Sequence, residues 1–161
     1  MDLYLFRHGI AEDRSGDMAD ADRALTEEGV KRTGQAAAGL ARLIEAEVTI
    51  ATSPKFRARQ TAELAAEALG VDAEVWESLG GGDVDAMIRS IADSGASALM
   101  VVGHEPDFGE LVERLCFGRS MGAVEMKKAG CACVRFSGRA VEGRGMLSWL
   151  ATPKMLRALG E

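Results

Sequence analysis

The chain has 161 residues, 47% of them hydrophobic, and a formal net charge of −6 at pH 7. This length favours a single domain, residues 1–161, with a core of useful size, and the composition excludes a disordered chain. No basic stretch offsets the negative charge, which argues against a nucleic-acid-binding surface.

Two further features of the sequence bear on the class of protein. The N-terminus has no basic region followed by a long apolar run, and the longest nearly apolar run, Ala98–Gly103, is too short to cross a bilayer. The three cysteines, Cys116, Cys131 and Cys133, fit neither a CxxC pair nor a zinc pattern. We therefore expect a cytoplasmic protein with reduced thiols, no metal site and no membrane contact, in which Cys131 and Cys133 lie on one face of a strand.

The first elements are a strand and a helix joined by a polar loop. The strand covers residues 3–6, and the loop, residues 12–23, is rich in Asp. Thr26 is the expected N-cap of the helix, with Glu27 and Glu28 at the positive end of its dipole. The apolar positions of this helix recur at helical spacing: Val30, Ala37, Leu40 and Ile44.

A second strand, predicted over residues 48–51, runs into a second helix. Ser53 is a natural N-cap for that helix, and Pro54 suits its first position. Its expected inner stripe consists of Ala58, Thr61, Ala62, Ala65 and Leu69. Residues 71–76 can form a short strand, and a further helix is expected over about residues 83–92.

The remaining elements complete a pattern in which strands and helices alternate. Residues 98–102 are uniformly apolar, as expected for a central parallel strand, and the following helix is expected to begin at Pro106. Two later strands are predicted near residues 131–136 and 146–150, and a short helix after Pro153. The pattern predicts an α/β three-layer sandwich with a central, largely parallel sheet.

Three of the predicted strands are followed by cationic side chains. The first strand ends in Arg7 and His8, and the second leads into a helix with Arg57 in its first turn. The apolar strand over residues 98–102 is followed by His104. Ligands of open α/β sheets bind beyond the carboxyl ends of the strands, so we expect these four side chains to meet. Two guanidiniums, two imidazoles and two helix N-termini predict a pocket for a phosphoryl group.

Each of these residues also has a purely structural interpretation when it is taken alone. Arg7-His8-Gly9 could be an ordinary turn, and His104 could be a hydrogen-bonded histidine at a strand end. Arg57 could be one solvated arginine between Lys55 and Arg59. We choose Arg57 over Arg59 because it lies in the first turn and flanks the inner stripe. The functional interpretation is supported by the placement of these residues at one edge of the sheet, and not by any one of them alone.

These motifs resemble those of the histidine phosphatase superfamily, whose hallmark is an Arg-His-Gly motif after the first strand. The sequence looks most like the short, SixA-type phosphohistidine phosphatases of that superfamily. The matching stretches span nearly the whole chain in order: LYLFRHG, LTEEG, ATSPKFRARQTAE, VVGHEP and LSWLATP. The resemblance implies a phosphoglycerate-mutase-like fold with no large insertions, and therefore an open site.

The resemblance also implies a role for each site residue. His8 would be the nucleophile, whose neutral imidazole attacks phosphorus before water hydrolyses the phosphohistidine. Arg7, Arg57 and a protonated His104 would hold the equatorial oxygens and stabilise their charge. Gly9 would let the backbone turn close to the phosphate. No cofactor or metal is expected, because fixed cations supply the charge.

One position departs from the superfamily pattern. Many superfamily phosphomonoesterases carry a general-acid Glu in an L-x-E pattern, where this chain has Leu79-Gly80-Gly81. Asp83 and Glu105 are the candidates for a general acid, with Glu77 also near, although each could be a surface carboxylate and Asp83 could cap its helix. A missing acid disfavours alkyl phosphates and matters less for phosphohistidine, whose imidazole can leave neutral.

Three hypotheses about function result. The first is a metal-independent phosphatase that acts on phosphohistidine of a protein partner, in signal transduction. The second is a small-molecule phosphomonoesterase with Asp83 or Glu105 as acid. The third is a phosphate- or phosphoprotein-binding module with little turnover, against which the intact histidines and arginines weigh. The sequence specifies neither an individual substrate nor an oligomeric state.

Overall fold

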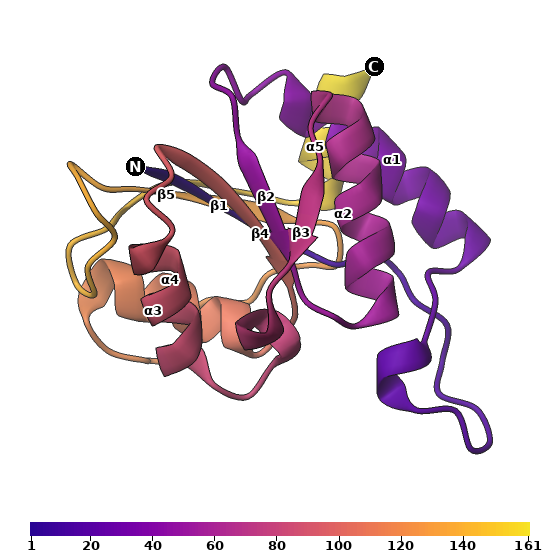
Figure 1. Cartoon of the computed structure of the whole chain (residues 1–161). Coiled ribbons are helices and arrows are strands. Elements are labelled where there is room, and N and C mark those ends of the chain that lie inside the picture. Colours follow the sequence, from indigo (N-terminus) through magenta and orange to yellow (C-terminus); the bar gives the residue numbers. More distant parts are fainter.

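A six-stranded sheet runs through the centre of the molecule, and the computed structural model describes every residue, 1–161 (Figure 1). Its strands are β1 (Asp2–Arg7), β2 (Thr49–Thr52), β3 (Ala73–Val75), β4 (Ala98–Gly103), β5 (Cys131–Arg135) and β6 (Met146–Ala151). Their order is β3-β2-β4-β1-β5-β6. The strands from β3 to β1 in this order are parallel, β5 is antiparallel to β1, and β6 is antiparallel to β5. The predicted α/β fold with a largely parallel sheet is confirmed.

Helices cover both faces of the sheet (Figure 1). One face carries α1 (Glu27–Ala41), α2 (Phe56–Leu69) and α5 (Pro153–Gly160), and the other carries α3 (Val84–Asp93) and α4 (Asp107–Phe117). Two short 3-10 helices, η1 (Asp20–Asp22) and η2 (Glu77–Gly80), lie in the connections. The predicted three-layer arrangement, without large insertions, is confirmed. No helix combines the length and apolar character needed to span a membrane.

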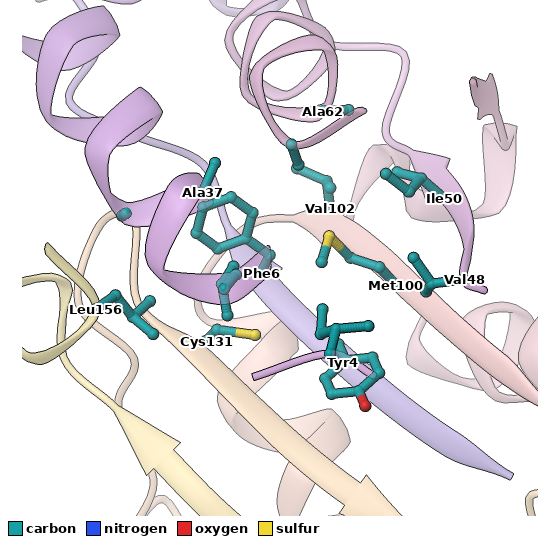
Figure 2. Close-up of a cluster of buried hydrophobic side chains, with 14 of the residues drawn as sticks. Tyr4, Phe6, Ala37, Val48, Ile50, Ala62, Met100, Val102, Cys131 and Leu156 are labelled. Atoms are coloured by element: carbon teal, nitrogen blue, oxygen red, sulfur yellow. The ribbon is translucent and has the colours of Figure 1, made fainter. Parts of the chain in front are cut away.

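The central strands are apolar throughout because both of their faces are buried. Side chains of β1 alternate, with Tyr4 and Phe6 packing toward α1 and α2, and Leu3 and Leu5 packing toward α3 and α4. Figure 2 shows the first of these layers, where Phe6 lies beside Ala37 of α1 and near Met100 and Val102 of β4. Cys131 and Cys133 of β5 belong to the same layer, as the sequence predicts. The result is a core that fixes the carboxyl ends of β1, β2 and β4.

Most predicted helix boundaries agree with the structure, but the start of α2 differs. The hydroxyl of Thr26 accepts from Gly29 N at 2.9 Å and caps α1 as predicted. By contrast, α2 begins at Phe56 with Lys55 as N-cap residue, so Ser53 and Pro54 precede the helix. The hydroxyl of Ser53 forms a long-range hydrogen bond with His104, which is described below.

Two smaller differences concern single residues. Val30, expected on the inner face of α1, is 39% exposed, whereas Ala37 and Leu40 of that face are buried. Pro106 is the N-cap residue of α4 and lies one position before the helix. Neither difference moves the predicted site residues relative to the sheet.

Candidate active site

A polar pocket of about 610 Å³ lies beyond the carboxyl ends of β1, β2 and β4. Arg7 and His8 reach it from the end of β1, Arg57 from the first turn of α2, and His104 from the end of β4. None of its fourteen lining residues is hydrophobic. The structure therefore brings the four predicted side chains together in one pocket suited to a charged ligand.

The imidazole of His8 is held in one tautomer. Its Nδ1 lies 2.7 Å from the carbonyl oxygen of Gly9, which can only accept, so Nδ1 carries the proton. Burial, with Arg57 and Arg7 also contributing, lowers the pKa of His8 to about 3. The ring is thus neutral near pH 7, and its Nε2 is unprotonated and carries the lone pair that a nucleophile requires.

The backbone that carries His8 is clamped against two helices. Gly9 N donates to Thr61 Oγ1 at 3.1 Å, and Thr61 Oγ1 donates to the carbonyl of Arg57 at 2.8 Å. A Cβ on Gly9 would lie 2.0 Å from Thr33 Oγ1 of α1. Glycine is therefore required for packing against α1, in addition to its expected role beside a phosphate, which stays a prediction.

Arg57 is almost fully buried and faces His8. Its Nε donates to His8 Nε2 at 3.4 Å, while Nη1 donates to the carbonyl of Asp20 at 2.6 Å and Nη2 to the Asp20 carboxylate at 3.0 Å. Arg59, two positions later, is exposed and lies over the ring of Phe56. The choice of Arg57 agrees with this geometry.

His104 closes the opposite side of the pocket, with its ring centroid 5.1 Å from that of His8. Its Nε2 and Ser53 Oγ are 2.8 Å apart, and Ser53 Oγ also accepts from Lys55 N at 3.2 Å in the turn before α2. Burial, followed by His8, Arg57 and Lys55, lowers the pKa of His104 to about 3. Without a phosphoryl group in the pocket, His104 is therefore neutral near pH 7, mainly because it is buried. The expectation of a protonated His104 concerns the phosphoryl-bound site and stays a prediction. A phosphoryl dianion beside the ring would raise this pKa.

Arg7 is the second site arginine that lines the pocket. Its Nη1 donates to the carbonyl of Met126 at 2.5 Å, and burial lowers its pKa from the ordinary arginine value. Two buried nitrogens of the site, Arg7 Nε and His104 Nδ1, have no hydrogen-bond partner in the protein. Unpaired buried polar atoms are uncommon, so these two point to a ligand with acceptor oxygens.

The two candidate acids are placed differently. Asp83 is exposed, does not line the pocket, and accepts from Ala86 N at 2.8 Å as the N-cap of α3. Glu105 does line the pocket, and burial raises its pKa, although its Oε1 accepts from Met126 N at 3.0 Å. The structure thus separates the candidates, because only Glu105 lines the pocket.

Several charged residues of the pocket were missed by sequence reasoning. Asp20 of η1 forms ion pairs with Arg57, Lys55 and Arg23. Partial burial raises the pKa of Asp20, but the hydrogen bonds from Arg57 and Arg23 outweigh the effect of burial, and the pKa is strongly lowered. Asp107 lines the pocket and accepts from Gly82 N at 2.9 Å. The Asp-rich loop was the only signal for Asp20.

Sequence comparison decides the family. A model of the histidine phosphatase superfamily (branch 1) matches residues 3–104, which include His8, Arg57 and His104. The chain belongs to the histidine phosphatase superfamily. It is therefore related to phosphatases by sequence as well as by the geometry of its pocket.

Two individual proteins resemble the chain over nearly its whole length. An uncharacterized protein of Picosynechococcus sp. strain PCC 7002 is 39% identical over 163 aligned positions, which cover 97% of this chain and 99% of that protein. The solved structure of the protein histidine phosphatase SixA complexed with tungstate is 28% identical, with a TM-score of 0.80, and covers 96% of this chain and 98% of its own.

A third similar structure has a different named activity. The alpha-ribazole phosphatase of Shigella flexneri is 15% identical, with a TM-score of 0.74, over 95% of this chain and 97% of its own. At this identity the likeness is one of fold. The superfamily fold is thus shared by proteins named for protein and small-molecule substrates.

Proposed function

We propose that this protein removes the phosphoryl group from phosphohistidine on a protein, through a covalent phosphohistidine on His8. The observation that carries the proposal is the pair of buried unpaired nitrogens, Arg7 Nε and His104 Nδ1, in the pocket of the neutral His8. A phosphoryl group has equatorial oxygens that can accept from Arg7 Nε–H, and from His104 when its Nδ1 carries a proton. The similarity to SixA supports a protein substrate.

In the first step, the lone pair of His8 Nε2 attacks phosphorus, and the bond between phosphorus and the substrate nitrogen breaks. His8 becomes a phosphoimidazolium whose Nδ1–H remains bonded to the Gly9 carbonyl. Arg57 Nε lies 3.4 Å from Nε2, and so it is placed beside the transferred group. Fixed donors aimed at the equatorial oxygens stabilise the charge of the transition state.

In the second step, water attacks phosphorus and the bond to His8 Nε2 breaks. The water proton leaves with inorganic phosphate or passes to solvent, and His8 returns to its neutral form with Nδ1 protonated. Asp20 stays ionised and binds the far edge of Arg57, which keeps that guanidinium in place during both steps. The chain's own cations supply the positive charge that both steps need.

The leaving group favours phosphohistidine over alkyl phosphates. A substrate imidazole protonated at its other nitrogen leaves as a neutral ring, whereas an alkoxide needs a general acid. The L-x-E position holds Gly81, and Asp83 caps α3 outside the pocket. A substrate with a good leaving group is therefore the one that this pocket serves best.

One observation favours a second candidate function. Glu105 lines the pocket and its pKa is raised by burial, which are the properties of a general acid. With Glu105 as acid, the protein would be a small-molecule phosphomonoesterase. The two candidates differ in how strongly the rate depends on the leaving group.

The test is kcat/KM for a phosphohistidine peptide, an aryl phosphate and several alkyl phosphates, measured for the wild type, Glu105→Gln and Asp83→Asn. We expect the first two substrates to be cleaved, the alkyl phosphates to be poor, and both variants to change the phosphohistidine rate only modestly. If an alkyl phosphate is the best substrate and Glu105→Gln loses about 10²–10⁴-fold on it alone, the second candidate replaces the first. Binding of phosphate without turnover of any substrate would support the binding-module hypothesis.

A further inference from the structure

A second polar cleft, strongly cationic, lies beside the active-site pocket. Its volume is about 200 Å³, and of its ten lining residues five are Lys or Arg and none is acidic. The five cations are Arg32 of α1, Lys127 and Lys128 of the segment before β5, and Lys154 and Arg157 of α5. The chain as a whole carries more acidic than basic residues, so this cleft is a local concentration of positive charge.

The sheet topology places the cleft at the same edge as the active site. Since β5 is antiparallel to β1 and β6 is antiparallel to β5, the start of β5 and the end of β6 lie where β1 ends. Ala129 N, just before β5, donates to the carbonyls of Arg7 and His8 at 3.1 Å each. Lys128 lines both the cleft and the active-site pocket. The cleft is therefore a lateral continuation of the site.

The charges of the cleft are largely unopposed. Arg32 pairs with Glu28, and Lys127 pairs with Glu125 at 3.3 Å. Both pairs are well exposed, and exposed pairs hold their partners weakly. The other three cations, Lys128, Lys154 and Arg157, form no ion pair within the protein. These side chains are free to meet carboxylates from outside.

We propose that this cationic cleft is a docking site for acidic side chains of the protein that carries the phosphohistidine. The inference rests on the proposed function. A substrate that fills only the phosphoryl pocket leaves the α5 cations unused, whereas a polypeptide continues along the surface next to its phosphorylated residue. Complementary charge across such a surface selects partners and accelerates their encounter, and salt screens it.

The experiment compares two synthetic peptides with the same phosphohistidine, one flanked by Glu residues and one by Gln, with an aryl phosphate as a small substrate. The variant carries Lys154→Glu with Arg157→Glu. The matched control carries Arg119→Glu with Arg144→Glu. Both arginines are exposed and form no side-chain ion pair. Arg119 follows α4 and Arg144 precedes β6, so both lie away from the site. Both double variants change the net charge equally.

We expect the wild type to prefer the Glu peptide in kcat/KM by roughly fivefold or more, as a few exposed ion pairs allow, with the preference falling as salt rises. The α5 variant should lose the preference, the control should keep it, and both should cleave the aryl phosphate at the wild-type rate. That last rate also shows that the variants are folded.

The remaining outcomes overturn the inference in distinguishable ways. Equal cleavage of both peptides by the wild type, or an intact preference in the α5 variant, would refute the docking site and leave the proposed function standing. Cleavage of the aryl phosphate but of neither peptide would refute the proposed substrate, and the docking site with it. An aryl bisphosphate serves as a fourth substrate. If the wild type prefers it to the aryl phosphate and the α5 variant loses that preference, the cleft binds a second phosphate and the docking site is refuted.

Discussion

The protonation state of His8 follows from two residues and its burial. The Gly9 carbonyl takes the Nδ1 proton, and the guanidinium of Arg57 faces Nε2 at 3.4 Å. A second proton on the ring would be buried beside a cation, so the neutral form persists well below ordinary histidine pKa values. The proposed nucleophile is therefore in its neutral form before any substrate binds.

The two neighbouring arginines of α2 allow a matched test of the pocket geometry. Arg57→Ala should lower turnover by roughly a hundredfold or more, because it removes a donor placed at the transferred group. Arg57→Lys should recover little, since an ammonium cannot make the same forked contacts. Arg59→Ala should leave turnover nearly unchanged, because Arg59 is exposed and contacts Phe56. Steady-state kinetics measure all three, and an essential Arg59 would show that the assignment of Arg57 is wrong.

At the scale of elements, the end of β1 is fitted against α1 and α2. Thr61 of α2 binds Gly9 N, and Thr33 of α1 leaves no room for a side chain on Gly9. The hydroxyl of Thr33 is buried without a hydrogen-bond partner, so it serves packing only. The Arg-His-Gly motif is thus held by packing as well as by its chemistry.

A double-mutant cycle tests this interface. Gly9→Ala should lower the free energy of unfolding by roughly 1–3 kcal/mol, as overpacking does, and adding Thr33→Ala should restore much of it. Gly34→Ala is the control in α1, where a Cβ would meet only Leu64 at 3.8 Å, and it should stabilise the protein by about 0.5–1 kcal/mol. Urea denaturation measures each variant. Additive effects of the Gly9 and Thr33 changes would show that the two residues do not compete for space.

The elements also show what the sequence could predict. Apolar strands and their carboxyl ends were enough to bring Arg7, His8, Arg57 and His104 together, because topology alone fixes that edge. Ser53 was misassigned as the N-cap because α2 begins only at Phe56, and its contact with His104, far away in the sequence, could not be predicted from local patterns. Asp20, Asp107 and Lys128 reach the pocket from connections whose paths depend on tertiary packing, and local patterns do not encode such paths.

For the whole molecule, two buried neutral histidines couple folding to pH. Burial lowers the pKa of both His8 and His104 from 6.5 to about 3. Between these values the unfolded chain binds more protons than the folded one, so stability is fully present above about pH 6.5 and falls as the pH falls. This acid sensitivity is a consequence of keeping the proposed nucleophile, His8, and its neighbour His104 neutral.

The size of this effect is measurable by urea denaturation. Between about pH 7 and about pH 5, each histidine should account for roughly 2 kcal/mol of lost stability. His8→Gln and His104→Gln should each lose less stability than the wild type over this range, whatever their stability at neutral pH. The same pH dependence in all three proteins would mean that the histidines are not held neutral.

The most direct test of the whole account is to trap the phosphorylated enzyme. Acidic conditions are avoided because they would hydrolyse phosphohistidine. The enzyme is mixed with a labelled phosphohistidine peptide or aryl phosphate and denatured in alkali, with a chelator present throughout. The labelled residue is then mapped by mass spectrometry. We predict an alkali-stable, acid-labile phosphate on His8 that His8→Ala lacks, together with loss of turnover in that variant. A label on a serine or aspartate, turnover that His8→Ala leaves undiminished, or activity that the chelator abolishes and a divalent ion restores would contradict it.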